Sequence, residues 1–412
     1  MFGGIYMKLA WRNVLRNKRR TFIAGIAIGV GLAALISMDA LIIGMEKNMI
    51  KSATGSFMGE GQIHREDFRK AFEVERTIAD LEQVVAGLEQ EPLVENFTLR
   101  TLAFGMISSP ANVSSVSMVG VDPSTEPYLS EIDDVMVEGS YFDGEGDISR
   151  QILIGAKLAE LLEVGLGDRV VMTVAQAETG DLAQEMFRIS GIYYFKSLEL
   201  DQGMAFVRLD KAQQMLGLEG RVHQIALKFH DSNVGRDGDH PFWSMYSQNG
   251  NEALSWTRLM PTLESVLDLS QWATLILGVI LFAVVALGII NTLFMSLYER
   301  MFEFGVLRAV GTRPVALGRL ILFEAGALAL IAICMGMALG FIITYLLSTF
   351  GIDYSGIEYA GVTFRKLLYP VMQPRQFIEF PIYVFLFTVL VGLYPATYAA
   401  RLTPARAMRK SF

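Results

Sequence analysis

The chain has almost none of the residues from which disulfides and metal centres are built. It holds one cysteine and four histidines in 412 residues. The single cysteine, Cys334, cannot form an internal disulfide, so any soluble part must fold by burying apolar surface alone. The histidines lack the spacing of metal ligands and lie at His64, His223, His230 and His240. We therefore expect no metal centre.

A nucleotide-binding loop is also missing. Such a loop needs four residues between two glycines, then lysine and serine or threonine, because its amides hold phosphate and the lysine neutralises it. Residues 305–311 have one residue too many between their glycines, and Thr312 and Arg313 follow. We expect this chain to bind no cofactor and to have no enzymatic activity of its own.

Charged residues are few, at 19%, whereas 52% of the chain is hydrophobic and the mean hydropathy is +0.37. The chain contains four long apolar runs: residues 22–44, 272–297, 321–347 and 382–400. Each is about as long as the roughly 20 residues that cross a bilayer core, and each can satisfy its backbone internally as a helix. Buried helices of a soluble protein are the alternative, but they rarely run this long without a polar face.

Two ionisable residues interrupt these runs, Asp39 in the first and Glu324 in the third. Ionisable residues inside a membrane are often functional. Both residues lie near the end of a run, however, where water or headgroups can solvate them. This position favours a structural role for each.

The positions of lysine and arginine predict the orientation. Residues 1–21, 298–320 and 401–412 hold 14 of the 35 basic residues, and only two of the 43 acids, Glu299 and Glu303, join them. We therefore expect these segments, with both termini, in the cytoplasm. Residues 45–271 and 348–381 are then expected on the other side of the membrane.

Residues 1–21 are expected to form an amphipathic helix that lies in the membrane interface. Lys8, Arg12 and Arg16 fall on one helical face, and Met7 and Trp11 fall on another. A simpler alternative is that the basic residues only keep the N-terminus in the cytoplasm. The segment can serve in both ways. A cleaved signal peptide is less favoured, because the apolar run is long and lacks a convincing cleavage site.

Residues 45–271 are predicted to form a mixed α/β domain that ends in a helical stalk. The predicted helices are 77–89, 156–164 and 209–216, and the predicted strands are 113–121, 152–154, 169–175, 187–194, 204–207 and 225–229. A Gly- and Asp-rich loop is expected at 231–239. From about residue 252, a helical pattern is expected to run unbroken into the second span. The predicted fold class is thus a membrane protein with four transmembrane helices and a large mixed α/β domain between the first two.

The segment 299–313, between the second and third runs, is predicted to be a short helix that is apolar on more than one side. Phe302 and Val306 lie on one apolar side, and Glu303 and Arg308 are positioned to meet charges on a partner. Gly311 suits the end of this helix, and the following proline suits the first turn of the next. A simple connector packed on lipid headgroups is the alternative.

These residues resemble the coupling helix of the FtsX/MacB superfamily of ABC transporter permeases. Three further stretches resemble that superfamily: the N-terminal residues 9–21, the third span with Glu324, and the closing residues 394–409. Residues 154–213 are similar to the periplasmic domain of the lipoprotein-releasing LolC/LolE branch.

The resemblance implies an inner-membrane permease of a Gram-negative cell with a periplasmic α/β domain. It implies pairing with an identical or sister permease, and two copies of a separate ATPase that binds ATP and magnesium. It also implies a lipid-modified protein substrate and a periplasmic carrier or adaptor. Motion of the ATPase would then reach the periplasm by mechanotransmission. The positions implied to contact the ATPase are Arg300, Glu303, Phe304, Gly305, Leu307, Arg308 and Gly311.

Three alternatives to lipoprotein release remain open. The first is an efflux or peptide-export permease that works with an adaptor. The second is FtsX-like signalling to a periplasmic hydrolase without transport. The third is a membrane-anchored receptor or structural protein without an ATPase, against which the 299–313 motif argues.

Overall fold

The computed structural model describes residues 3–16, 18–142, 148–354, 357–359, 362–363 and 367–403. The chain divides into two compact units. The helical unit comprises Met1–Lys47, Asp268–Asp353 and Leu367–Phe412, and the sheet unit comprises Asn48–Leu267 and Tyr354–Lys366. The closing motif predicted at 394–409 is described only as far as residue 403.

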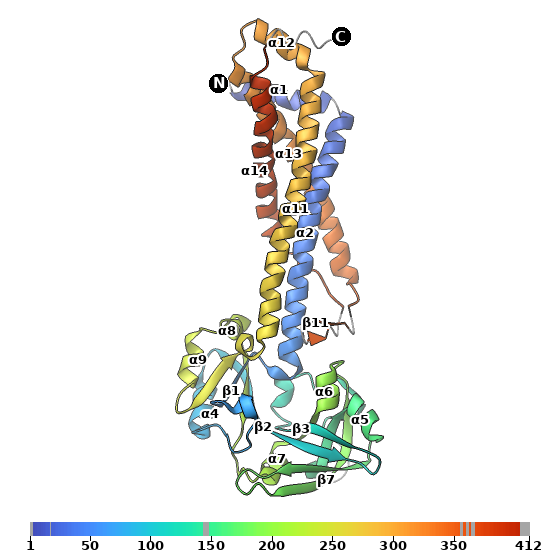
Figure 1. The fold of residues 1–412 in the computed structure, drawn as a ribbon, viewed down its shortest axis with the longest axis vertical. Helices are drawn as coiled ribbons and strands as arrows, with labels where there is room; N and C mark the ends of the chain where they lie inside the picture. Colours follow the sequence, from blue (N-terminus) through green and yellow to red (C-terminus); the bar gives the residue numbers. More distant parts are fainter. Residues whose placement is uncertain are drawn as a thin grey trace. The chain divides into compact units, whose positions relative to one another are not determined.

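Long helices build the helical unit. They are α1 (Gly3–Arg16), α2 (Lys18–Ala53), α11 (Pro261–Glu299), α13 (Pro314–Phe350) and α14 (Gln376–Ala400), with the short α12 (Met301–Ala309) between α11 and α13 (Figure 1). Among the described residues, four helices are long and apolar enough to cross a membrane, and they contain the four predicted runs. These apolar helices and the mixed sheet unit fit the coarser part of the prediction, a helical membrane protein with a mixed α/β domain.

Helices α2 and α13 approach closely because glycines face each other across their contact. A Cβ atom on Gly336 would lie 2.7 Å from the carbonyl oxygen of Gly29, a distance that real side chains do not tolerate. Apolar side chains surround this contact, including Ile28, Leu32 and Leu328. Small residues let the backbones of membrane helices approach closely, and the resulting van der Waals packing helps to drive helix association in lipid.

The sheet unit contains a closed ring of strands. Its members are β2 (Val94–Ser108), β3 (Val113–Val121), β8 (Met204–Arg208), β5 (Gln151–Gly155), β7 (Leu182–Tyr193) and β6 (Arg169–Ala175). Each strand pairs with the next in this order, and β6 pairs back with β2. The β3–β8 and β5–β7 pairs are parallel and the others antiparallel. Alternate residues such as Ile107, Met172 and Phe187 fill the interior, as in other small barrels.

The same sheet continues beyond the ring from the N-terminal half of β2. There β9 (Gln224–Phe229) pairs with β2, β1 (Gly61–Arg65) with β9, and β10 (Asn251–Ser255) with β1, while β4 (Met136–Gly139) pairs with β7. Short helices pack on the ring strands, namely α5 (Ala156–Leu162), α6 (Leu198–Gly203) and α7 (Leu209–Leu216). Others pack on β2 and the strands that extend from it, namely α3 (Phe68–Ala71), α4 (Leu81–Gln90), α8 (Ser232–Arg236), α9 (Pro241–Tyr246) and α10 (Trp256–Leu259). A separate two-stranded pair joins β11 (Glu358–Tyr359) and β12 (Val362–Thr363).

An ion pair lies inside the sheet unit. Arg100, on β2, donates through Nε and Nη2 to both carboxylate oxygens of Glu126, at 2.9 and 2.6 Å. Its Nη1 donates to the carbonyl oxygen of Phe57, and the guanidinium lies 4.0 Å from the centre of the Phe57 ring. Both charged side chains are fully buried. This geometry fixes the end of α2's continuation, a single π-helical turn at Thr54–Met58, against β2.

Most predicted elements of the sheet unit are confirmed, and two predictions are wrong. Strands 113–121 and 169–175 and helix 209–216 have the predicted bounds. The loop predicted at 231–239 contains helix α8, because Asp231 caps it by accepting a hydrogen bond from the Asn233 amide. The helical pattern from residue 252 is interrupted, since Asn251–Ser255 pairs with β1 and the long helix begins only at Pro261.

Candidate coupling site on helix α12

Helix α12 is separated from its neighbours by a residue of special conformation at each end. Arg300 leaves the helical region, with φ −108° and ψ 13°, so α11 ends at Glu299 and α12 begins at Met301. After Ala309, Gly311 adopts φ +98°, which favours glycine, and Pro314 is the first residue of α13. The predicted roles of Gly311 and Pro314 as boundaries are confirmed.

One face of α12 is buried in the helical unit. Met301, Phe304 and Gly305 are buried, and the Phe304 side chain is 1% exposed. Met301 and Phe304 pack in a cluster with residues of α1, α11, α13 and α14, which include Ala10, Leu297, Leu317, Leu320 and Ala399. The spacing i, i+3, i+4 puts Met301, Phe304 and Gly305 on one side of the helix. This face holds α12 on the bundle.

A carboxylate on α13 binds side chains from α1 and from the junction between α11 and α12. Oε1 of Glu324 accepts a hydrogen bond from Nδ2 of Asn13 on α1 at 2.7 Å and from Nη1 of Arg300 at 2.6 Å. The side chain of Glu324 is 6% exposed and that of Arg300 is 13% exposed. The sequence predicts a structural role for Glu324, and these contacts supply one.

The charges of α12 are paired within the chain. Nε of Arg300 donates to Oε2 of Glu303 at 3.0 Å, and Nη2 of Arg16 lies 3.4 Å from Oε1 of Glu303. Burial disfavours the charge of Arg300, but Glu324 and Glu303 outweigh this and raise the pKa of Arg300. The hydrogen bond from Arg300 lowers the pKa of Glu303. Nη1 of Arg308 donates to the carbonyl oxygen of Thr312 at 2.9 Å.

The opposite face of α12 is apolar and exposed. Phe302, Val306, Leu307 and Val310 are all exposed, and Val310 reaches 83%. Residues 302, 306 and 310 follow one another at i, i+4 and i+8, so they form a stripe that continues one residue past the helix. We call these four residues the α12 outer face. An exposed cluster of this kind is typical of an interaction surface.

The structure thus divides the seven residues predicted to contact an ATPase. Leu307 and Gly311 are exposed, and Glu303 is half-exposed but paired. Phe304 and Gly305 are buried, Arg300 points into the bundle, and Arg308 is half-buried. The sequence did not reveal Asn13 as part of this site, because 311 positions separate it from Glu324.

Helix α1 shows three stripes. Ala10 and Val14 are buried against the bundle, while Trp11 is exposed on an apolar stripe with Met7 and Leu15. Arg12 and Arg16 are exposed beside them. The turn into α2 is fixed by Thr21, whose hydroxyl donates to the carbonyl oxygen of Val14 at 2.5 Å. This pattern fits an interfacial helix, whose role stays a prediction.

Asp39 lies on α2 and also has a partner. Oδ2 of Asp39 accepts a hydrogen bond from Nε2 of Gln376 at 2.8 Å, at the start of α14. One residue further along α2, the carbonyl oxygen of Ala40 accepts from the Val371 amide at 2.9 Å. Asp39 therefore helps to fasten α14 to α2.

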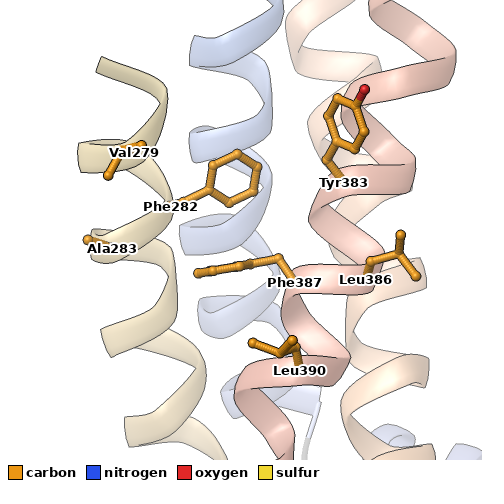
Figure 2. A pocket seen from close by; sticks show the side chains of 7 residues that line it. All are labelled: Val279, Phe282, Ala283, Tyr383, Leu386, Phe387 and Leu390. Carbon is orange, nitrogen blue, oxygen red and sulfur yellow. The ribbon is translucent and has the colours of Figure 1, made fainter. Parts of the chain in front are cut away.

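An open apolar groove of about 560 Å³ lies between α11 and α14. Figure 2 shows its lining: Val279, Phe282, Ala283, Tyr383, Leu386, Phe387 and Leu390. The Phe282 and Phe387 rings meet edge to face with centres 4.9 Å apart. Among the described residues, no group of three or more His, Cys, Asp or Glu side chains is placed to hold a metal ion.

Two family models match the chain. The MacB-like periplasmic core domain matches residues 21–234, and the FtsX-like permease C-terminal domain matches residues 275–404. The first covers about half of the chain, and together they include most of both structural units.

Two lipoprotein-releasing relatives match from end to end at low identity, and an export protein matches over part of its own length. A LolC protein of Xylella fastidiosa, described as a lipoprotein-releasing system transmembrane protein, is 25% identical over 99% of this chain and 100% of its own length. A LolE protein of the same description from Haemophilus influenzae is 22% identical over 97% and 98%. The macrolide export ATP-binding/permease protein MacB of Vibrio parahaemolyticus is 23% identical over 98% of this chain and 60% of its own length.

Proposed function

Because this chain belongs to the FtsX/MacB family of ABC transporter permeases, we propose that it extracts lipoproteins from the inner membrane for a periplasmic carrier. One observation carries this choice within the family: the similarity to LolC extends over the full length of both proteins. The permease acts as a mechanotransmitter, in which hydrolysis by a partner subunit drives movement of the membrane helices and the periplasmic unit.

The partner binds at the α12 outer face. Family members work with ABC ATPase partners, and this chain offers Phe302, Val306, Leu307 and Val310 as a compact apolar surface on a helix seated firmly in the bundle. Aromatic and large aliphatic residues dominate the energetics of protein interfaces. We propose that two copies of a separate ATPase bind a permease dimer, one at each α12, and that ATP and magnesium act in those subunits.

The proposed location follows from charge. Lys and Arg predict that α1, α12 and both termini face the cytoplasm, so the sheet unit lies in the periplasm. The substrate's acyl chains then enter from the outer leaflet of the inner membrane, next to the outer half of α2. Apolar-to-charged changes there should weaken binding of a lipid-linked substrate without preventing assembly.

The test uses the permease purified with its partners and reconstituted in liposomes. A photo-reactive acylated protein is supplied, and ATP-dependent transfer to a soluble carrier fraction is measured. We compare Met38→Glu on α2 with Leu346→Glu on α13, since both side chains are exposed. Met38→Glu should lower crosslinking to the acylated protein several-fold, and Leu346→Glu should not. Equal crosslinking in both variants, or no release by the unaltered protein, contradicts lipoprotein release.

Efflux with an adaptor is the second candidate, favoured by the similarity to MacB over 98% of this chain. Co-purification followed by mass spectrometry separates the two. A trapped lipid-modified protein supports lipoprotein release, whereas an adaptor protein and an accumulated small molecule or peptide support export. A periplasmic hydrolase with no transported species supports FtsX-like signalling.

A further inference from the structure

The helical backbone is interrupted between α11 and α12. Arg300 interrupts the helical backbone there, so the only covalent link from α11 to α12 is a residue outside the helical region. A helix joined in this way can pivot unless side chains hold it. The side chain of Arg300, at the junction itself, contacts residues of α12 and α13.

The guanidinium of Arg300 is fixed on three sides. Nη1 donates to Glu324 on α13 at 2.6 Å, Nε donates to Glu303 on α12 at 3.0 Å, and the Phe304 ring centre lies 5.0 Å away. Asn13 on α1 donates to the same Glu324 oxygen that Arg300 uses. One buried carboxylate thus binds side chains from α1 and from the α11–α12 junction.

Burial makes this contact hard to break. Separating the pair would leave a charged group on Glu324 in a site that is 6% exposed, without a charged partner. Surface pairs cost little to break, whereas an uncompensated buried charge is strongly unfavourable. The geometry also depends on the planar fork of arginine, which meets two carboxylates at once.

We propose that Arg300, Glu324 and Asn13 form a latch that makes α12 and α13 move as one body. A force applied to the α12 outer face is then transmitted to the membrane-spanning α13, so that α12 does not tilt alone. In this assignment Arg300 is a positioning residue and does not contact the ATPase. The inference rests on the proposed function, in which force enters at α12.

The experiment uses the full permease with its bound ATPase in nanodiscs. In a Cys334→Ser background, spin labels are placed at two exposed positions, Ala309 on α12, which is not part of the α12 outer face, and Leu330 on α13. Their distance distribution is measured with and without a non-hydrolysable ATP analogue. Retention of the ATPase and output per ATP hydrolysed are measured on the same preparations without labels.

The latch predicts one narrow distance distribution in the unaltered protein, with or without nucleotide. Glu324→Ala and Arg300→Ala should broaden it and lower the output per ATP about tenfold, which corresponds to about 1.4 kcal/mol, while the ATPase stays bound. Arg300→Lys, which keeps the charge but lacks the planar fork, should broaden the distribution less than Arg300→Ala and restore part of the output. Arg375→Ala, which breaks the exposed pair with Glu379 on α14, is the matched control. It should change neither the distance distribution nor the output per ATP.

Two results would overturn the latch. One is a narrow distribution and normal output in Glu324→Ala. The other is a loss of bound ATPase that matches the loss of output, which would make Arg300 a docking residue. If Glu324→Ala does not accumulate, Glu324→Gln keeps the side-chain shape and should give a smaller broadening. If the unaltered protein releases no acylated protein, lipoprotein release fails, but the spin-label distances still decide on the latch.

Discussion

At the scale of single residues, the buried charges of the sheet unit matter most for stability. Arg100 lies in the middle of the long strand β2, a segment for which we predict no strand. Its partner Glu126 lies in a short turn after β3. No spacing rule connects the two, so β2 and this pair could not be predicted from the sequence, although the neighbouring strand 113–121 could.

Glu126→Ala should destabilise the sheet unit by about 3–5 kcal/mol, because Arg100 would remain buried without its counter-charge. Urea unfolding, followed by the fluorescence of the buried Trp243 and Trp256, measures this in the solubilised full chain. Asp239→Ala, which breaks an exposed pair with Arg258, is the control and should have little effect. A similar, small change in the free energy of unfolding of both variants would show that the buried Arg100–Glu126 pair contributes little to stability.

The sheet unit should also lose stability in mild acid. Burial, helped by the charge of Arg69, lowers the pKa of His64 to about 3, and burial also lowers the pKa of His223. Nδ1 of His223 accepts from the Leu102 amide and Nε2 donates to the carbonyl oxygen of Val74, which requires the neutral ring. The unfolded chain binds these protons below about pH 6.5, whereas the folded chain does not.

Stability therefore falls as the pH drops from about 6.5 towards 3. For His64 the slope approaches about 1.4 kcal/mol per pH unit. His64→Gln should flatten this slope in urea titrations between pH 7 and 4, and the exposed His230→Gln should leave it as it is. An unchanged slope in His64→Gln would rule out His64 as its source.

At the scale of elements, α12 shows what a sequence can and cannot predict. Its limits followed from Gly311 and Pro314, because those residues have strong conformational preferences. Which face of α12 is buried could not be predicted, since Phe302, Phe304 and Val306 are all apolar. Only the packing of Phe304 against α11, α13 and α14 distinguishes the buried face from the outer one.

The α2–α13 contact gives a prediction about helix packing. Gly336→Ala would bring a Cβ atom within 2.7 Å of the Gly29 carbonyl oxygen, so the helices must separate, at a cost of about 1–3 kcal/mol. Thermal unfolding in detergent should show a lower melting temperature. Gly288→Ala on α11, where a Cβ meets nothing within 4 Å, should leave it unchanged or raise it. A Gly336→Ala protein as stable as Gly288→Ala would mean that the helices tolerate the wider spacing.

At the scale of the whole molecule, the apolar runs predict the long helices, and the distribution of lysine and arginine predicts the orientation. Long apolar helices are recognised because their length is set by the bilayer. The closed strand ring was not foreseen, since the β6–β2 pairing that closes it joins strands far apart in the chain.

Orientation can be tested with single cysteines in a Cys334→Ser background. An impermeant maleimide added to spheroplasts should label a cysteine at Glu178, an exposed position of the sheet unit, and should not label one at Val310. After lysis, both should react. If the cysteine at position 310 reacts in intact spheroplasts and the one at position 178 does not, the proposed orientation is wrong.

Site-specific photo-crosslinking at Val310 tests the central claim, that a separate ATPase drives this permease through the α12 outer face. A photo-reactive residue at Val310 should crosslink, in cells, to a protein that mass spectrometry identifies as an ABC ATPase. The same residue at Leu330, exposed on α13 within the third apolar run, should not. Crosslinks from Val310 only to lipid or to proteins without a nucleotide-binding site would contradict the account.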